Sequence, residues 1–344
     1  MGAFLQIGLA PGGRAETNAS VRFLTTALLL LGLSAAGRAA VKTSYSAAGM
    51  TYDGALCLDA TTGSVLVEKM ADMRGHPASV TKLMTTLLVL EDVRAGKLAL
   101  TSRVSVTKAA AGVGGSQVWL APGESFTVEE LLYALMLRSA NDVAVALAIE
   151  RAGSVPAFVT RMNRRAAELG MTRTTFVTPN GLTTGAGPHD TTSARDLGRL
   201  CLALVKFPEV FRFTAAKEYT FRRPLKSLQL VNHNHLLDGY AGCDGFKTGW
   251  TVAAKASIVT TAKAGDQRVI AIVLGCDSPQ GAKAAQRLRD QLAANLMDEG
   301  FAKLKAAEAA KARASAAPPT PSPKTALKPR EPDFWDWLGD LFSF

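Results

Sequence analysis

Apolar residues recur at helical spacing in two parts of the chain, and each pattern predicts a buried helix. The first helix is predicted to begin at Ser79, and its apolar positions are Val80, Leu83, Met84, Leu87, Leu88 and Leu90. The second follows a capping-box pattern at Thr127 and Glu130, and its apolar positions are Leu131, Leu132, Leu135 and Met136. The pattern stops at 138–142 and resumes at Val143, which predicts a turn between two helices.

The later part of the chain has the pattern of strands followed by a helix. Residues 256–261 and 268–274 are typical of two strands joined by a turn at 264–266, and a last helix is predicted over 280–297. With 344 residues, of which 48% are apolar, the chain can bury one large core, and no second core is obvious.

The first 40 residues are typical of an export signal. Arg14 and Arg22 precede an apolar run at 23–33, and small residues follow it, with cleavage expected near 36–40. The alternative is a transmembrane anchor, but the apolar run is shorter than the ~20 residues that a span requires. We therefore expect an exported protein, located in the periplasm or at the outer face of the cytoplasmic membrane.

The end of the chain departs from globular composition. Residues 301–332 are rich in Ala, Lys and Pro and are predicted to be a linker. The final segment, 333–344, would be an amphipathic helix whose apolar face contains Phe334, Trp337, Leu338 and Leu341. This helix is too short to span a membrane but is suited to peripheral contact with one. Because its polar face is acidic, docking on a partner protein is the alternative.

The net charge of +10 does not indicate nucleic-acid binding. The positive charge is not concentrated in a recognisable reading helix with aromatic partners, and an exported protein would rarely meet nucleic acid. Much of the excess lies in the tail, at Lys303, Lys305, Lys311, Arg313, Lys324, Lys328 and Arg330. A basic surface favours encounter with anionic cell-wall polymer or membrane headgroups.

The four cysteines are widely spaced, and neither they nor the four histidines have metal-ligand spacing, so no metal or cofactor is expected. In an oxidising compartment one disulfide is a candidate, between Cys57 and Cys276, which both lie on predicted strands. Buried thiols at Cys57, Cys201, Cys243 and Cys276 are the alternative.

Three short motifs carry candidate chemistry: Ser79-Val80-Thr81-Lys82, Ser139-Ala140-Asn141 and Lys247-Thr248-Gly249. On a helix that begins at Ser79, Lys82 lies one turn further on the same face, so its amine can approach the hydroxyl. Together the motifs supply a nucleophile, a base and an electrostatic anchor for acyl transfer without histidine.

Each motif alone has a simpler interpretation. The tetrapeptide Ser-Val-Thr-Lys recurs at 105–108, in an alternating stretch without a helix signal, so Ser105 is interpreted as an ordinary surface or strand serine. The Ser139 segment alone could be a helix cap. The segment at 247–249 could be a loop, although its glycine suits a strand that a ligand backbone approaches closely.

This set of motifs resembles the Ser-x-x-Lys, Ser-Asp-Asn and Lys-Thr-Gly set of class A β-lactamases and penicillin-binding proteins. Over roughly residues 50–298 the chain resembles the D-alanyl-D-alanine carboxypeptidase family of low-molecular-mass penicillin-binding proteins. Further matching segments lie at 59–63, 76–79, 114–116, 162–163, 169–171, 179–182, 193–196 and 244–247.

The resemblance implies an α/β fold of the β-lactamase and penicillin-binding type. Its central, mostly antiparallel sheet would be flanked by helices, with a helical subdomain, and the catalytic domain would span 41–300. The β-rich second domain of the best-known family members is expected to be missing here.

The resemblance also implies roles for the motif residues. Ser79 would attack the substrate carbonyl after losing its proton to Lys82, Ser139 would pass a proton to the departing amine, and Asn141 would hold the substrate amide. Lys247, Thr248 and Gly249 would bind the terminal carboxylate side of the substrate. The backbone N–H groups of Ser79 and Trp250 would form the oxyanion hole.

One position in the predicted site departs from some relatives. They place an arginine in the segment that matches 232–235, where it helps bind the substrate carboxylate, and this chain has His233 there. A histidine binds an anion well only when protonated, which predicts pH-sensitive recognition. A polar loop residue without that role is the alternative.

The implied activity is removal of the terminal D-alanine from peptidoglycan stem pentapeptides, with covalent inhibition by β-lactam antibiotics. D,D-transpeptidase or D,D-endopeptidase activity is the alternative. A β-lactamase is disfavoured because no class A-type Glu-x-x-x-Asn segment lies between Asn141 and Lys247. A non-catalytic penicillin sensor is disfavoured because it needs no matched nucleophile and base.

Overall fold

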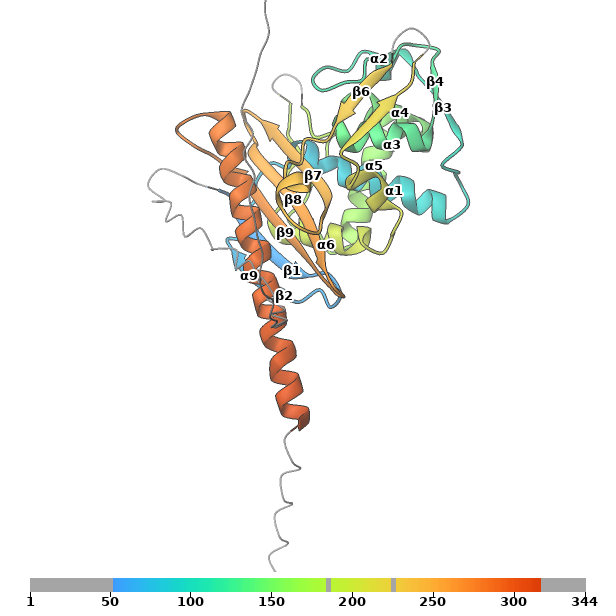
Figure 1. The fold of residues 1–344 in the computed structure, drawn as a ribbon. Helices are drawn as coiled ribbons and strands as arrows, with labels where there is room; N and C mark the ends of the chain where they lie inside the picture. Colours follow the sequence, from blue (N-terminus) through green and yellow to red (C-terminus); the bar gives the residue numbers. More distant parts are fainter. Residues whose placement is uncertain (1–51, 184–186, 224–226, 317–344) are drawn as a thin grey trace, which may run out of the picture. The chain divides into compact units, whose positions relative to one another are not determined.

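The computed structural model describes residues 52–183, 187–223 and 227–316 (Figure 1). The predicted export signal at 1–40, the linker beyond residue 316 and the amphipathic helix at 333–344 lie outside these residues.

The described chain alternates between strands, which are mostly short before residue 240, and helices. The strands are β1 (Gly54–Asp59), β2 (Val65–Lys69), β3 (Arg103–Ser105), β4 (Ser125–Thr127), β5 (Glu218–Phe221), β6 (Leu228–Val231), β7 (Cys243–Thr251), β8 (Lys255–Ala264) and β9 (Gln267–Cys276). The helices are a 3₁₀ turn η1 (Ala78–Thr81), α1 (Lys82–Arg94), α2 (Lys108–Ala111), α3 (Val128–Leu137), α4 (Asn141–Ala152), α5 (Val155–Glu168), α6 (Ala194–Leu204), α7 (Val210–Thr214), α8 (Leu236–Gly239) and α9 (Ala282–Ala316).

The main sheet has five strands in the order β2-β1-β9-β8-β7, and every neighbouring pair is antiparallel. Successive side chains of β1 point to opposite faces, as a period of two requires. Leu56 and Leu58 pack in the core shared with α1 and α6, whereas Ala55 and Cys57 pack against α9. Figure 1 shows α9 lying across one face of the sheet. The predicted antiparallel sheet flanked by helices is confirmed.

Helices α1 to α5 pack on one another and form the predicted helical subdomain, beside the sheet face that α9 leaves free (Figure 1). The capping box predicted at its centre is present: Glu130 N–H donates to the Thr127 hydroxyl, and Thr127 N–H donates to the Glu130 carboxylate. The duplicated tetrapeptide behaves as expected, since Ser105 lies exposed on the short strand β3.

The predicted helix from Ser79 begins later than expected. Ala78 has a φ of +47°, and residues 78–81 form a 3₁₀ turn before the α-helix starts at Lys82. The Thr81 hydroxyl donates to the carboxylate of Asp190, 3.0 Å away, and this bond ties the turn to a distant loop. Such turns are common at helix N-termini. Ser79 and Lys82 nevertheless remain adjacent.

The last helix runs much further than the predicted 280–297. Helix α9 continues to Ala316, so residues 301–316 of the segment predicted to be a linker are helical. The residues concerned are mainly Ala, Lys, Glu and Arg, which have high helix propensity. Lys303 and Glu299, which are one turn apart, form an ion pair of 3.0 Å that further stabilises the helix.

The candidate disulfide between Cys57 and Cys276 is not formed. Cys57 pairs with Ala271 across β1 and β9, which places Cys276 five residues further along the strand, roughly 17 Å away. All four cysteines are free thiols, and all but the partly exposed Cys243 are buried, as the alternative expected. Burial raises the pKa of the Cys57 thiol to about 12.

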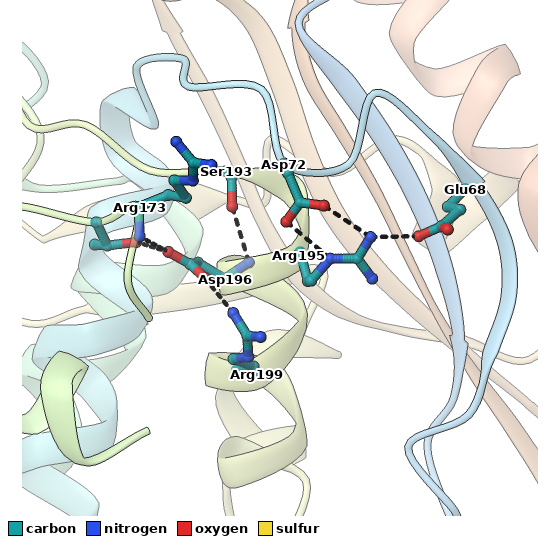
Figure 2. A network of polar contacts seen from close by, with 8 residues as sticks. Glu68, Asp72, Arg173, Ser193, Arg195, Asp196 and Arg199 are labelled. Carbon is teal, nitrogen blue, oxygen red and sulfur yellow. Dashed lines mark hydrogen bonds and ion pairs between the residues drawn. The ribbon is translucent and has the colours of Figure 1, made fainter. Parts of the chain in front are cut away.

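Two polar clusters fasten the start of α6 to the strands and loops around it (Figure 2). Arg195 donates to Asp72 over 2.8 and 2.9 Å and to Glu68 over 2.6 Å. The neighbouring carboxylate of Asp196 is fully buried and accepts bonds from Arg199 and from the backbone N–H of Arg173. These contacts hold the chain before residue 175 and after residue 191, on either side of the loop that carries Asn180.

Among the described residues, no single helix has both the length and the hydropathy that crossing a membrane requires. The pair α4 and α5 meets those two criteria only when taken together, and it is bent by 85°.

Candidate active site

The amine of Lys82 is the centre of the candidate site. Its Nζ is fully buried and donates to the Ser79 hydroxyl over 2.9 Å, to Asn141 Oδ1 over 2.7 Å and to the Asn180 carbonyl over 2.7 Å. The first two motifs, far apart in the sequence, thus meet at one atom. The expected approach of the amine to the hydroxyl is confirmed.

The pKa of Lys82 lies well below its ordinary value. Burial is the largest cause, the positive charge of Lys247 adds to it, and the carboxylates of Asp190 and Asp142 oppose it. A neutral amine has two N–H groups and one lone pair. The two acceptors at Asn141 and Asn180 can take both N–H groups, which leaves the lone pair facing the Ser79 hydroxyl. In this state Lys82 is arranged as a base for Ser79.

Ser139 and Asn141 lie where α3 gives way to α4. Ser139 has a φ of +61° and is 4% exposed, and its Oγ is the one buried side-chain polar atom without a hydrogen-bond partner among the described residues. The residue at the cap position is Ala140, which makes no side-chain capping bond, so the helix-cap interpretation is wrong. Unpaired buried hydroxyls are rare and call for a functional explanation.

Asn141 is oriented through both ends of its amide. Its Oδ1 accepts from Lys82, its Nδ2 donates to the Gly114 carbonyl over 2.9 Å, and its backbone N–H donates to the Ser116 carbonyl over 2.7 Å. These bonds fix the position of the loop 114–116 relative to the amine.

The third motif lies within β7, at the edge of the main sheet. A Cβ atom on Gly249 would lie 2.6 Å from the Pro77 carbonyl oxygen and 3.2 Å from the Ser79 nitrogen. Gly249 was expected to let a ligand backbone approach closely. In the structure the backbone at Pro77 and Ser79 approaches it closely. A side chain at this position would push β7 away from the turn that carries Ser79.

Lys247 is a buried cation with no carboxylate partner among the described side chains. It is 2% exposed, and its Nζ donates to the Thr248 carbonyl over 3.0 Å. Burial and the charge of Arg289 lower its pKa to about 7. An arriving carboxylate would stabilise the charged amine, because it would supply the missing counter-charge.

A cavity of about 330 Å³ brings the motifs together. We call it the active-site cavity, and it is lined by Ser79, Ser116, Ser139, His233, His235, Thr248, Gly249, Trp250, Gln286 and Arg289. No carboxylate is among these residues. The cavity is therefore suited to an anionic ligand. Within the described chain, no group of three or more His, Cys, Asp or Glu side chains is arranged to hold a metal ion.

His233 lines the cavity, but its charge differs from the expectation. Burial lowers its pKa to about 4, and the charges of Lys247 and Arg138 contribute. Near neutral pH the ring is uncharged, so a cationic role in carboxylate recognition is not available to it there. This favours the alternative interpretation, in which His233 is a polar residue of the site without a cationic role.

Arg289 is the main residue that sequence reasoning missed. It lies on α9, is 3% exposed, and reaches the cavity beside Gln286. Its guanidinium pairs with Asp290 over 2.7 Å and donates to the Ser257 carbonyl over 3.3 Å. The helix was predicted from periodicity, but nothing in the local pattern indicated that this arginine faces the site.

Asp190 is a second missed residue, and it positions the nucleophile turn. Its carboxylate accepts from the Thr81 hydroxyl over 3.0 Å and from the Thr178 hydroxyl over 2.8 Å. It also accepts from the backbone N–H groups of Val177 and Thr178. The carboxylate therefore ties the loop that supplies the Asn180 carbonyl to the turn that carries Ser79.

Comparisons with known proteins agree with this geometry. The family model described as D-alanyl-D-alanine carboxypeptidase matches residues 41–278. The D-alanyl-D-alanine carboxypeptidase DacF of Bacillus subtilis is 40% identical over 227 residues, which cover 66% of this chain and 58% of that protein. DacB2 of Mycobacterium tuberculosis, with the same enzyme name, is 35% identical over 71% of this chain and 80% of its own length.

A solved structure has the same fold. Penicillin-Binding Protein D2 from Listeria monocytogenes in the ampicillin-bound form aligns with a TM-score of 0.62 and 31% identity, over 73% of this chain and 97% of that one. The chain spans about 60% of the length of several curated relatives, including 58% of DacF and 60% of DacC from Escherichia coli.

Proposed function

The chain belongs to the D-alanyl-D-alanine carboxypeptidase family, and on that basis we propose that it is a serine D,D-carboxypeptidase acting on peptidoglycan stem peptides. The observation that carries the proposal is the 2.9 Å contact between Lys82 Nζ and Ser79 Oγ, together with the two other acceptors around the amine. That arrangement supports a neutral lysine acting as base for a serine nucleophile.

The first half of the reaction forms an acyl-enzyme. Lys82 accepts the hydroxyl proton as Ser79 Oγ bonds to the carbonyl carbon of the penultimate D-alanine. The carbonyl oxygen takes the negative charge, and the backbone N–H groups of Ser79 and Trp250 are its donors. Each such donor is typically worth ~3 kcal/mol in the transition state. The C–N bond then breaks, and the proton that Lys82 took from Ser79 is passed through the Ser139 hydroxyl to the leaving amine of the terminal D-alanine, which leaves Lys82 neutral again.

The second half uses water. A water molecule attacks the ester, Ser79 regains its proton, and the shortened peptide leaves as a carboxylate. Asn141 holds the substrate amide through this cycle. An acceptor amine in place of water would give transpeptidation, and a cross-linked substrate would give endopeptidase action, so these remain the alternatives.

Charge selects the substrate. The terminal carboxylate would lie between Lys247, Thr248 and Arg289, because the buried amine of Lys247 has no carboxylate partner among the described side chains and the cavity lining supplies none. Arg289 thereby replaces the cation that His233 cannot supply at neutral pH. A β-lactam carries a comparable carboxylate, and its acyl-enzyme would persist if deacylation is slow.

The test uses fluorescent penicillin and diacetyl-Lys-D-Ala-D-Ala with the wild-type protein, Ser79→Ala and Ser105→Ala. Ser105 begins the second Ser-Val-Thr-Lys tetrapeptide and is exposed, so it is a matched control. We expect stable label and released D-alanine in the wild type and in Ser105→Ala, and neither in Ser79→Ala. Label without D-alanine would favour the transpeptidase or endopeptidase alternative. Rapid loss of label with penicillin turnover would favour a β-lactamase.

The location of the protein is part of the proposal. We propose that 1–40 directs export to the periplasm or to the outer face of the cytoplasmic membrane, and that 333–344 makes peripheral membrane contact. Fractionation of cells that express the full chain, with mass analysis of its N-terminus, tests the first point. Deleting 333–344 tests the second, since the protein should then leave the membrane fraction.

A further inference from the structure

A tryptophan and an arginine lie beside the active-site cavity and have no part in the proposed mechanism. Trp119 is 55% exposed, and the guanidinium carbon of Arg138 lies 5.7 Å from its ring centroid. Arg138 directly precedes Ser139 in the chain, and Ser116 lies three residues before Trp119. Because Ser116 and Ser139 both line the cavity, the pair lies at the edge formed by the helical subdomain.

The exposed position of Trp119 is imposed by the residues on either side of it. Its φ of +56° is unusual for a residue with a side chain and costs of order 1 kcal/mol. The backbone N–H groups of Val118 and Leu120 donate to the buried carboxylate of Asp142 over 3.2 and 3.0 Å. The Val118 carbonyl also accepts from Arg223 over 3.1 Å. The chain is thus held so that a large aromatic ring faces solvent.

Arg138 carries a positive charge that faces the site without a counter-ion. No carboxylate within the described ranges forms an ion pair with it, although its side chain is only partly exposed. Its charge contributes to the lowered pKa of His233, a residue of the cavity lining. Its field therefore reaches the space that a ligand would occupy.

The orientation of a bound substrate would place the residues before its attacked bond at the cavity edge that contains Ser116 and Ser139. The cations proposed for the terminal carboxylate belong to β7 and α9, on the sheet side of the cavity, and the attacked carbonyl lies at Ser79. The part of the peptide before the attacked bond must then leave on the other side, along Ser116 and Ser139. Trp119 and Arg138 lie three residues and one residue away from these two serines along the chain.

We infer that Trp119 and Arg138 form a subsite for the residue that precedes the terminal D-alanyl-D-alanine. The alkyl part of its side chain would lie on the indole ring, and a carboxylate at the end of that side chain would pair with the guanidinium. The preferred donor is therefore a peptide with a diaminopimelyl residue at this position rather than a lysyl residue. This inference rests on the proposed function.

The test compares kcat/KM for two acylated tripeptides that end in D-Ala-D-Ala, one with meso-diaminopimelate and one with lysine before it. We expect the wild type to prefer the diaminopimelyl peptide, and Arg138→Gln to lower that preference about tenfold, mainly through KM. Arg138→Lys should restore part of it. Trp119→Ala should lower kcat/KM for both peptides. Trp119→Phe should change kcat/KM little for either peptide. Arg164→Gln is the matched control, since Arg164 is 70% exposed on α5.

The outcomes separate the two hypotheses. If the wild type releases D-alanine from neither peptide, the proposed function fails and the subsite fails with it. If it releases D-alanine but the ratio of the two kcat/KM values is the same in Arg138→Gln as in the wild type, only the subsite is refuted. Labelling of each variant by fluorescent penicillin shows whether it has folded.

Discussion

The buried charge of Lys247 should make the stability of the protein depend on pH in a defined direction. Burial and Arg289 lower its pKa from the ordinary 10.5 to about 7 in the folded chain. Between these two values the unfolded chain binds a proton that the folded chain does not. The free energy of unfolding therefore rises with pH in this window, and below about pH 7 the full cost of burying the charge is present.

The expected size follows from the same two values. Each pKa unit corresponds to about 1.4 kcal/mol, so the whole difference is worth roughly 5 kcal/mol. Between pH 7 and pH 9 the free energy of unfolding should rise by about 2 kcal/mol through Lys247, because its amine is already half deprotonated in the folded chain at pH 7. Replacement by Met removes the charge at nearly constant volume, and this contribution should disappear with it.

Urea unfolding at several pH values between 6 and 9 measures the effect. The difference in free energy of unfolding between wild type and Lys247→Met should change by about 2 kcal/mol from pH 7 to pH 9, with Met the more stabilising residue at the lower pH. Taking this difference cancels the titration of the cysteines. Lys263→Met, at an exposed position on β8, is the control. A wild-type-minus-variant difference that stays constant with pH would refute the argument.

Four other changes have defined outcomes. The value of kcat/KM for a D-alanyl-D-alanine peptide should fall as pH rises above about 7, because Lys247 in the free enzyme loses its proton; a profile that stays flat to pH 9 would contradict this. Asn141→Ala removes an acceptor from Lys82 and should slow acylation by penicillin about 100-fold, measured by the rate of labelling, whereas an unchanged rate would rule out this role. Gly249→Ala should destabilise the fold by ~1–3 kcal/mol and lower kcat, since its Cβ would lie 2.6 Å from the Pro77 carbonyl; an equally stable and active variant would show that β7 can move aside freely. Asp142→Ala leaves the N–H groups of Val118 and Leu120 without their acceptor and should cost ~1–3 kcal/mol for each in urea unfolding, and a variant as stable as wild type would mean that other acceptors replace the carboxylate.

The residues that the sequence located are those whose relation is local. Lys82 lies one turn after Ser79, and Asn141 lies two residues after Ser139, so closeness in the sequence alone places the residues of each motif near one another. Strands β8 and β9 were predictable because each is a short apolar run and a turn at 264–266 separates them.

The residues that the sequence did not locate depend on where distant elements cross. Arg289 looks like any basic residue of an amphipathic helix until α9 is placed across the sheet. Asp190 reaches Thr81 across more than a hundred residues. The lowered pKa of His233 results from its burial and from nearby positive charges such as Lys247. Neither the burial nor these neighbours can be predicted from the local sequence.

Helix α9 gives the protein a strict requirement of length. Arg289 near its start lines the active-site cavity, Gly300 lies against the Cys57 sulfur, and Phe301 and Leu304 pack on the outer face of the sheet. One residue inserted between Arg289 and Gly300 would rotate everything beyond it by about 100° and advance it by about 1.5 Å. The arginine and the packed residues could then not both keep their places, so this stretch should tolerate substitutions on its exposed face but no change in the number of residues.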